Sequence, residues 1–338
     1  MNKRNALVIG LWHWKRVWFG HFFPEYHLSY ADLGTTPEGI EDMVVVKNVS
    51  VLIIWGYSED PETLALASAS DIAVFRVEDG FLRSRGLTGD EEPAISLCVD
   101  SQDLYFNPYK PSDLEELLSR HDFRRDTQLL RRAAQSIADL KTRGISKYNH
   151  APASDPSTIF TGHAKPRILV VGQVEDDMSI KFGANRGYTN NRLVEQARDE
   201  NPGAEIVYKP HPDVLAGHRK ARSNPARVSH LAKIVTTPLH VTDVLPIVDV
   251  IYTATSLVGL EALLWGVEVR VVGKPFYAGW GLTIDDHQFP RRQRRLALEE
   301  LFAGCYLLYP RYAHPESGDR IDALTAITLL AGSRQHAA

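Results

Sequence analysis

Short apolar runs alternate with polar or periodic segments along the whole chain. In the first half, four such runs predict strands, at residues 6–11, 51–55, 72–77 and 95–99. Continuous apolar runs of this length, bounded by turn residues, are typical of strands buried on both faces. Apolar positions recur every three to four residues over 127–143, which predicts a long amphipathic helix. Another helix is expected to begin at 111–115.

The second half repeats the pattern after a break. Residues 149–165 are rich in Pro, Ser, Thr, Ala and His, which is typical of a linker. A new alternation follows, with strands expected at 167–171, 205–208, 248–252 and 269–272, and helices at 191–198 and 257–265. Gly266 comes directly after the last helix, where glycine commonly ends one.

Two successive βαβ units joined by a linker predict an α/β protein with two Rossmann-like domains facing across a cleft. We expect a first domain at 1–150, a linker at 151–165, a second domain at 166–310 and a tail at 311–338 that packs back on the first. Neither half carries G-x-G-x-x-G after its first strand, which argues against a nicotinamide or flavin dinucleotide.

Composition narrows the class of protein. The 338 residues are 44% hydrophobic and 24% charged, with a formal charge of −4, which argues against a nucleic-acid partner. Two cysteines, Cys98 and Cys305, cannot build a disulfide framework and favour a reducing cytoplasmic location. The apolar run at 6–11 is too short for a signal peptide, and no run reaches the roughly 18 to 20 residues of a membrane span. Peripheral association with a membrane stays open.

The segment Lys209-Pro210-His211-Pro212 follows the expected strand at 205–208. Ligands bind at the carboxyl ends of strands in open α/β sheets. The two prolines stiffen the backbone around His211, and Lys209 adds positive charge, so the cluster suits a phosphate group. A surface turn with a solvated histidine is the alternative interpretation.

Hydroxyl side chains lie between the expected strand at 248–252 and the helix at 257–265. Free backbone N–H groups and the positive end of the helix dipole meet there and favour an anion. Ser256 and Thr255 therefore become candidate phosphate ligands, although simple helix capping explains a serine equally directly. Glu261, one turn into the helix, is either a ribose ligand or an exposed helix carboxylate.

Two further loops carry carboxylates after expected strands. Glu78 and Asp79 precede a glycine and can supply a general base, the alternative being a plain Asp-Gly turn. Arg83 and Arg85 follow and can bind an anionic sugar. Glu175-Asp176-Asp177 crowds three carboxylates into one loop, which is costly unless a metal, a cation or a reaction uses them. Its spacing matches no metal-binding loop that we can name, so a nucleophilic role is favoured.

An aromatic and glycine-rich loop follows the last expected strand. Tyr277 and Trp280 in this loop are candidates for a lid or a base-stacking wall, with inter-domain packing as the alternative. Arg291–Arg295 is a charge run; most such runs are solvated faces, and an acidic polymer or a lipid headgroup is the less favoured partner.

Together these motifs resemble the capsule polysaccharide biosynthesis proteins of Gram-negative bacteria, which are retaining β-Kdo glycosyltransferases. The matching segments are residues 14–16, 77–83, 146–149 (Ser-Lys-Tyr-Asn), 172–180, 209–214, 255–262 and 276–283. The Glu-Asp-Gly and His-Pro pairs more distantly resemble motifs of bacterial sialyltransferases. The order and joint presence of the segments make the resemblance specific, and they span almost the whole chain.

The resemblance implies a glycosyltransferase of the B architecture that uses CMP-Kdo as donor, with no metal or cofactor. It implies that Asp177 is the nucleophile of a double displacement and that Glu78 is the acid/base group. The expected donor-binding group comprises His211, Lys209, Ser256, Thr255, Glu261 and Gln173. The expected groups for the acceptor or the Kdo carboxylate are Arg83, Arg85, Lys15 and Arg16.

The resemblance also implies a Kdo-terminated lipid or glycan acceptor and a cytoplasmic enzyme at the inner-membrane surface. Segments 172–177 and 276–283 look more like the second module of two-module capsule enzymes, which is associated with a 2→7 linkage. This chain carries one such module. The alternatives are an inverting transferase of the CMP-sialic-acid type and a non-catalytic module that binds an acidic glycan in a capsule assembly complex.

Overall fold

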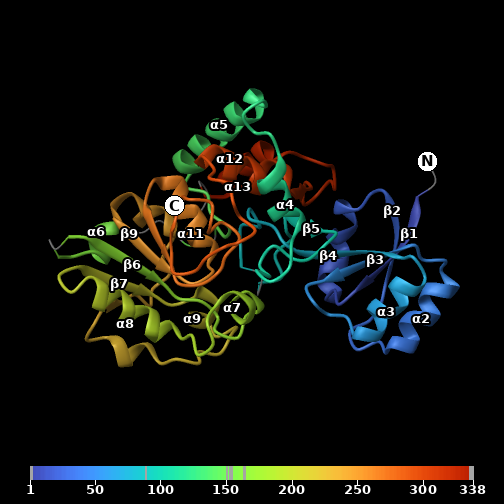
Figure 1. Ribbon diagram of the computed structural model, residues 1–338, viewed down its shortest axis with the longest axis horizontal. Coiled ribbons are helices and arrows are strands. Elements are labelled where there is room, and N and C mark those ends of the chain that lie inside the picture. The colour runs from blue at the N-terminus through green and yellow to red at the C-terminus, as the bar shows by residue number, and fades with distance from the viewer. Residues whose placement is uncertain (1–2, 88–89, 150, 152–154, 163–164, 335–338) are drawn as a thin grey trace.

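Two six-stranded sheets lie along the long axis of the molecule, with helices packed on them and between them (Figure 1). The computed structural model describes residues 3–87, 90–149, 151, 155–162 and 165–334. The predicted α/β class with two Rossmann-like domains is confirmed. No helix in these described ranges is long and apolar enough to cross a membrane.

The first sheet is mixed. Its strand order is β2 (Tyr26–Tyr30), β1 (Arg4–Ile9), β3 (Val51–Trp55), β4 (Ala73–Asp79), β5 (Ser96–Asp100) and β12 (Pro310–Tyr312). The four strands from β2 to β4 are parallel, whereas β5 and β12 each pair antiparallel with their neighbours. The sequence pattern missed β2, because this half-buried edge strand carries polar residues.

The second sheet is fully parallel. Its strand order is β8 (Lys233–Ile234), β7 (Glu205–Lys209), β6 (Arg167–Val171), β9 (Val250–Thr253), β10 (Glu268–Val271) and β11 (Ile284–Asp285). This is the strand order of the Rossmann fold, and the direction of winding reverses between β6 and β9. A ligand site is therefore expected where the loops after these two strands meet.

Helices cover both sheets. They are α1 (Arg16–Phe19), α2 (Pro37–Val46), α3 (Pro61–Ala69), α4 (Asp113–Arg120), α5 (Thr127–Arg143), α6 (Pro156–Ile159), α7 (Met178–Gly183), α8 (Asn190–Glu200), α9 (Pro212–Leu215), α10 (Val241–Val244), α11 (Leu257–Trp265), α12 (Leu298–Phe302) and α13 (Ala323–Arg334), with a π-helical turn at Ala303–Leu308. Several begin as their sequences dictate: Thr36 and Ser112 cap α2 and α4 through their hydroxyl groups. Gly144 and Gly266 end α5 and α11 in the left-handed conformation.

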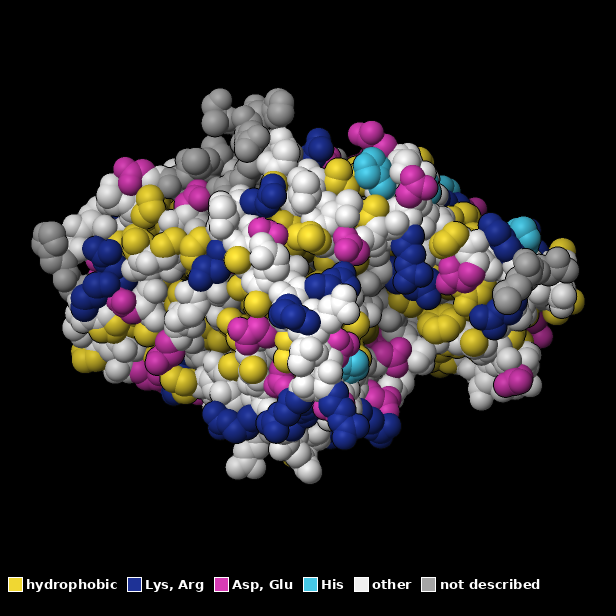
Figure 2. All heavy atoms as spheres, turned by 90° about the horizontal axis from the view of Figure 1, so that it is seen from above, with side chains coloured by type: hydrophobic (Ala, Val, Ile, Leu, Met, Phe, Trp, Pro, Cys, Tyr) yellow, Lys and Arg dark blue, Asp and Glu magenta, His cyan; other side chains and the backbone are white. Residues whose placement is uncertain are grey.

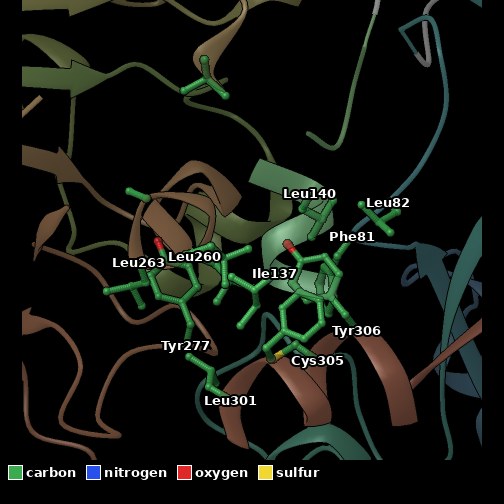
Figure 3. Close-up of a cluster of buried hydrophobic side chains, with 14 of the residues drawn as sticks. Phe81, Leu82, Ile137, Leu140, Leu260, Leu263, Tyr277, Leu301, Cys305 and Tyr306 are labelled. Carbon is green, nitrogen blue, oxygen red and sulfur yellow. The ribbon is translucent and has the colours of Figure 1, made fainter. Parts of the chain in front are cut away.

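The largest hydrophobic core joins the two halves of the chain. Helix α5 packs against α11, α12 and α13, as Figure 3 shows for its residues Ile137 and Leu140. Phe81, just beyond the end of β4, stacks on Phe276 of the second half with ring centroids 4.7 Å apart. Because β12 then returns to the first sheet, α5, α12, α13 and the π-helical turn form a layer between the sheets.

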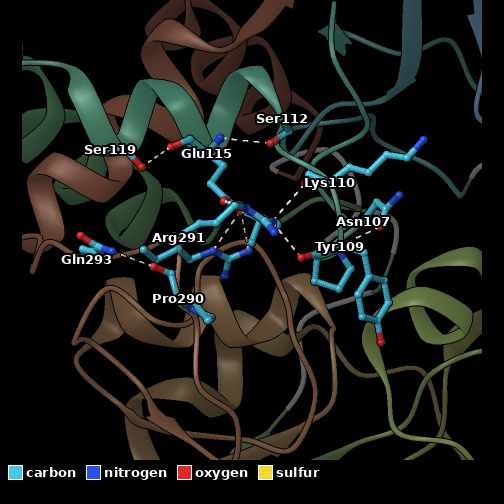
Figure 4. Close-up of polar contacts among 12 residues, drawn as sticks. Asn107, Tyr109, Lys110, Ser112, Glu115, Ser119, Pro290, Arg291 and Gln293 are labelled. Carbon is cyan, nitrogen blue, oxygen red and sulfur yellow. Dashed lines mark hydrogen bonds and ion pairs between the residues drawn. The ribbon is translucent and has the colours of Figure 1, made fainter.

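An ion cluster with a buried centre connects α4 to the second domain. Glu115 on α4 accepts hydrogen bonds from Arg291 and Arg292 (Figure 4). Arg292 is buried and also donates to the backbone carbonyls of Pro275 and Ala278, at 2.6 and 2.7 Å. The interpretation of 291–295 as a solvated face is therefore wrong for Arg292, whose charge is used inside the molecule.

On the face seen in Figure 2, acidic and basic side chains are interspersed, with a group of Lys and Arg side chains along one edge. Apolar side chains lie singly or in small groups between them. This mixed surface is typical of an ordinary water-exposed protein face.

Candidate active site

The carboxyl end of β4 places two carboxylates side by side. Asp79 is buried and lies 3.0 Å from Arg83 Nε and 3.8 Å from Lys15 Nζ. Burial works against its charge, but Lys15, Arg83 and Lys147 outweigh it and lower the pKa of Asp79 to about 2. Asp79 is therefore an ionised, structurally fixed carboxylate.

Glu78 is the carboxylate suited to proton transfer. Burial, and then the negative charge of Asp79, raises its pKa to about 7. One of its oxygens accepts from the backbone N–H of Asp79 at 2.9 Å. The next turn requires glycine at position 80, because a Cβ there would lie 2.1 Å from Ser96 Oγ on the paired strand. A group that titrates near neutral pH can act as a general base at little cost in driving force.

The basic residues expected to bind a sugar carboxylate have other partners. Arg83 is fully buried against Asp79 and Ser84, and Lys15 is buried with its Nζ 3.4 Å from the centroid of the Trp55 ring. Arg16 pairs with Asp32 at 3.0 Å and with the carbonyl of Ala31. These three charges have partners inside the first domain, although Arg83 Nη2 makes no hydrogen bond among the described residues, and the predicted role in binding a carboxylate stays a prediction. Arg85 has an exposed side chain.

The segment Ser146–Asn149 lies against this carboxylate pair, and sequence reasoning had assigned it no role. The carbonyl of Lys147 accepts from the backbone N–H groups of Arg83 and Ser84, and Asn149 donates to the carbonyls of Ser84 and Arg85. Burial opposes the charge of Lys147, but Tyr148, Asp79 and Glu78 outweigh it and raise its pKa. Its ammonium group therefore stays protonated in the physiological range.

The reversal point of the second sheet is closed by a reciprocal pair. Gln173, after β6, donates to Thr255 Oγ1 at 2.9 Å and accepts from the Thr255 backbone N–H at 2.8 Å. Ser256 caps α11 by accepting from the N–H of Val258, and its carbonyl accepts from the buried Tyr277 hydroxyl. These contacts fix the loop at the N-terminus of α11, where backbone N–H groups and the helix dipole favour an anion.

The neighbouring strand β7 ends at Lys209, and His211 follows two residues later as the cap of α9; both residues are half-buried. His211 Nδ1 accepts from the N–H of Asp213, so the proton of the neutral ring is on Nε2. Burial lowers the pKa of His211 to about 4, although Asp213 opposes this shift. Burial likewise lowers the pKa of Lys209 to about 8, against the opposing charge of Glu261. The edge thus offers a neutral N–H donor and an ammonium group.

The acidic loop is less strained than its sequence implies. Glu175 accepts from Ser223 and from the N–H of Asn190, and Asp176 pairs with Arg219 and Arg222 at 2.8 and 3.3 Å. Cations and hydrogen-bond donors within the fold therefore engage two of the three carboxylates, which explains part of the crowding without a reaction. Asp177 caps α7 and accepts from Ser179 through Oδ2. No hydrogen bond to its other oxygen, Oδ1, is found among the described residues.

Glu261 is neither exposed nor directed at the loop of Ser256. It is 5% exposed and accepts from Ser146 Oγ and from the N–H of Lys147, both at 2.8 Å. Burial raises its pKa, although these hydrogen bonds and the charge of Lys147 oppose the shift. The exposed-carboxylate alternative is therefore wrong, since this carboxylate connects α11 to the Ser146–Asn149 segment, and the ribose-binding role stays a prediction.

Tyr277 and Trp280 cannot form a lid. Both are fully buried, and Trp280 donates from Nε1 to the carbonyl of Phe276 at 2.8 Å. Helix α11 has Gly259 opposite Tyr277, where a Cβ would lie 2.2 Å from the hydroxyl oxygen. The loop is inter-domain packing, the alternative interpretation of its sequence.

Charges from both sheets act on common residues. The pKa of Tyr105 is raised first by burial and then by negative charges that include Glu78 from the first sheet and Asp177 from the second. Likewise, the pKa of His211 responds to Asp177 and to Lys147. The carboxyl edges of the two sheets therefore contribute to one electrostatic neighbourhood. Among the described residues, no group of three or more His, Cys, Asp and Glu side chains is arranged to hold a metal ion.

Comparisons with known proteins place the chain in a family. A family model for capsule polysaccharide biosynthesis proteins matches residues 50–155 and 127–312. The chain is 40% identical over 325 residues to the lipopolysaccharide-processing protein LpsZ of Rhizobium meliloti, covering 96% of this chain and 74% of LpsZ. It is 39% identical over 324 residues to the capsule polysaccharide modification protein LipA of Neisseria meningitidis serogroup B, of which it spans 45%.

Two solved domains of Thermosulfurimonas dismutans KpsC have the same fold. Its β-Kdo 2,4 transferase shares 34% identity with a TM-score of 0.81, covering 98% of this chain and 99% of that one. Its β-Kdo 2,7 transferase shares 33% identity with a TM-score of 0.73, covering 98% and 100%. The two Rossmann-like domains thus have the glycosyltransferase B architecture. The chain belongs to the capsule polysaccharide biosynthesis protein family.

Proposed function

We propose that this chain is a retaining β-Kdo transferase that uses CMP-Kdo and extends a Kdo-terminated glycan or glycolipid of a surface polysaccharide. The observation that carries the proposal is the division of chemistry between the two sheets. The second presents groups for a phosphate, and the first presents a carboxylate that titrates near neutral pH. The 34% identity to a β-Kdo transferase structure over nearly the whole chain supports the choice of sugar.

The leaving group is the monophosphate of CMP. His211 donates from Nε2, Lys209 supplies a positive charge, and the N-terminus of α11 at Ser256 supplies a dipole, so charge developing on the phosphate is stabilised without a metal. Gln173 and Thr255 are engaged with each other and serve to hold this loop rather than to touch the donor.

The transfer proceeds in two displacements. The Asp177 carboxylate attacks the anomeric carbon of Kdo, the bond to the phosphate oxygen breaks, and CMP leaves with that electron pair. Glu78 then takes the proton of the acceptor hydroxyl as its oxygen attacks the same carbon and releases Asp177. Two inversions give net retention. Among the three acidic residues of the loop, Asp177 is chosen because Glu175 and Asp176 are engaged with Ser223 and with arginines.

Mass spectrometry of the protein after incubation with CMP-Kdo alone tests this mechanism. A Kdo-sized increment is expected on the peptide that contains Asp177, and Asp177→Asn should abolish transfer while retaining CMP binding. Asp176→Asn is the matched control and should keep transfer. An inverted product, or full transfer by Asp177→Asn, would eliminate the covalent route.

Which hydroxyl of the acceptor is glycosylated, and so whether the linkage is 2→4 or 2→7, requires an experiment. The 2→7 expectation rests partly on 276–283, but Tyr277 and Trp280 in this segment are fully buried. The TM-score is also higher for the 2,4 transferase than for the 2,7 transferase. NMR of the product made from a synthetic Kdo acceptor distinguishes the two linkages.

A further inference from the structure

Lys147 has no role in this scheme, although it lies between the two domains. Its backbone is held on both sides: the N–H donates to Glu261 of the second domain, and the carbonyl accepts from Arg83 and Ser84 of the first. Ser84 and Tyr148 form an additional parallel bridge beside it. The backbone of Lys147 is thus fixed from both domains at once, so its side chain departs from a rigid point.

The Lys147 ammonium group lies within electrostatic range of both sides of the site. Its charge acts on Glu78 and Asp79 in the first domain and on His211 in the second. Its direct surroundings are poor in partners: no carboxylate oxygen of the described residues comes within 4.0 Å of Nζ, and the nearest recorded contact is the Tyr148 ring, at 5.5 Å. By contrast, Asp79 has Lys15 and Arg83 as closer cations.

Lys147 is half-buried and forms no ion pair within 4.0 Å among the described residues, so its charge is available to a bound anion. Adjacent carboxylates alone do not explain the position, because Lys15 and Arg83 already serve Asp79. The backbone contacts place Lys147 where the two domains meet, and under the proposed function the donor brings two anionic groups there, a phosphate and a sugar carboxylate. Arg83, Lys15 and Arg16, the cations first expected there, are engaged elsewhere.

We propose that Lys147 is a substrate-binding residue whose ammonium group pairs with an anionic group of the donor, and that Glu261 is a positioning residue that fixes Lys147 through its backbone. This inference rests on the proposed function and deepens it. It also gives the Ser-Lys-Tyr-Asn segment a role: it carries a cation from the end of α5 to the point where the two sheets meet.

Binding measurements identify the anionic group. CMP and CMP-Kdo are titrated by calorimetry into Asp177→Asn, which blocks turnover, with and without Lys147→Met. Loss of a charge-assisted contact should weaken binding about 10- to 100-fold. Weaker binding of both ligands means that Lys147 holds the phosphate, and weaker binding of CMP-Kdo alone means that it holds the carboxylate. Unchanged affinity for both overturns the proposal.

Chemical rescue separates charge from packing. In Lys147→Cys, alkylation with 2-bromoethylamine restores an ammonium group of nearly the same length, whereas 2-bromoethanol adds a neutral one. Cys98 and Cys305 are fully buried and so are protected from the reagent. We expect kcat/KM for CMP-Kdo to recover with the amine and not with the alcohol; equal recovery would show a packing role and refute the proposal.

Two controls keep this test separate from the proposed function. Lys165→Cys, treated in the same way, should turn over like wild type, because Lys165 pairs with Asp249 at the opposite, amino end of the second sheet. Wild-type turnover of CMP-Kdo tests the proposed function itself, and the calorimetric comparison of CMP affinities does not depend on turnover.

Glu261→Gln keeps an acceptor for Ser146 and Lys147 and should retain more activity than Glu261→Ala, with the difference in the KM for CMP-Kdo.

Discussion

Replacing Arg292 by methionine should destabilise the protein strongly although the residue belongs to a surface-like run of charges. Its guanidinium group is buried, donates to two backbone carbonyls at 2.6 and 2.7 Å and contacts Glu115 at 3.3 Å. Methionine keeps an unbranched side chain but removes every donor and the charge that lies over the Trp280 and Phe289 rings. The change therefore isolates the polar contribution.

The magnitude follows from the groups left behind. Each hydrogen bond from a charged donor contributes about 1.5 to 3 kcal/mol, so the two carbonyls alone account for at least roughly 3 kcal/mol. Glu115 loses one partner but keeps Arg291, with Nε at 2.6 Å, so the full cost of an orphaned buried charge is not reached. We expect the free energy of unfolding to fall by about 3 to 5 kcal/mol.

Urea denaturation followed by far-UV circular dichroism measures the change. Arg295→Met is the control, because Arg295 makes one hydrogen bond, to the carbonyl of Gly281 at 3.2 Å, and its loss should cost less than about 1 kcal/mol. If the two variants unfold at the same urea concentration, Arg292 does not connect the domains in the way its contacts indicate.

Three other outcomes follow from the site and its packing. Because the pKa of Glu78 is raised to about 7 and the base must be ionised, the rate of transfer should fall about tenfold per pH unit below about 7; an acid limb near the ordinary value of 4.5 would contradict this assignment. Activity should survive excess EDTA, since the leaving group is stabilised by His211, Lys209 and the N-terminus of α11; loss of turnover that Mg²⁺ restores would make the acidic loop a metal site. Gly259→Ala should destabilise by roughly 1 to 3 kcal/mol, because its Cβ would lie 2.2 Å from the Tyr277 hydroxyl. Gly332→Ala in α13, with open space around it, should instead gain up to about 1 kcal/mol, and thermal unfolding compares the two.

Buried strands and strongly periodic helices were predictable from sequence. The strands at 51–55 and 167–171 and helix α5 at 127–143 have the predicted bounds, because their apolar patterns reflect burial directly. Edge elements were not: β2 is half-buried and polar, and β8, β11 and β12 are two or three residues long. The antiparallel return of the chain through β12 has no local signal, since it depends on contacts with residues more than 200 positions away.

Which polar groups reach the ends of the strands was also predictable, but their partners were not. His211, Glu78 and Ser256 lie at carboxyl edges, as the strand-loop pattern indicates. Arg83 and Glu261 carry charges suited to ligand binding, yet each has a partner within the fold. Arg83 pairs with Asp79, four residues earlier, and Glu261 accepts from Ser146, which is 115 residues away in the sequence. Lys147 could have been suspected from the matching Ser-Lys-Tyr-Asn segment, although its distance from Glu78 along the chain conceals their proximity.

The pairing of β12 with β5 has a consequence for synthesis on the ribosome. Until residues 310–312 have left the exit tunnel, the outer edge of β5 has no partner strand, and its backbone groups can pair with another nascent chain. The first sheet, most of which is made early, therefore stays incomplete until residues 310–312 have been made. Chains that stop before residue 310 should therefore aggregate through this edge, whereas chains released after α13 should not.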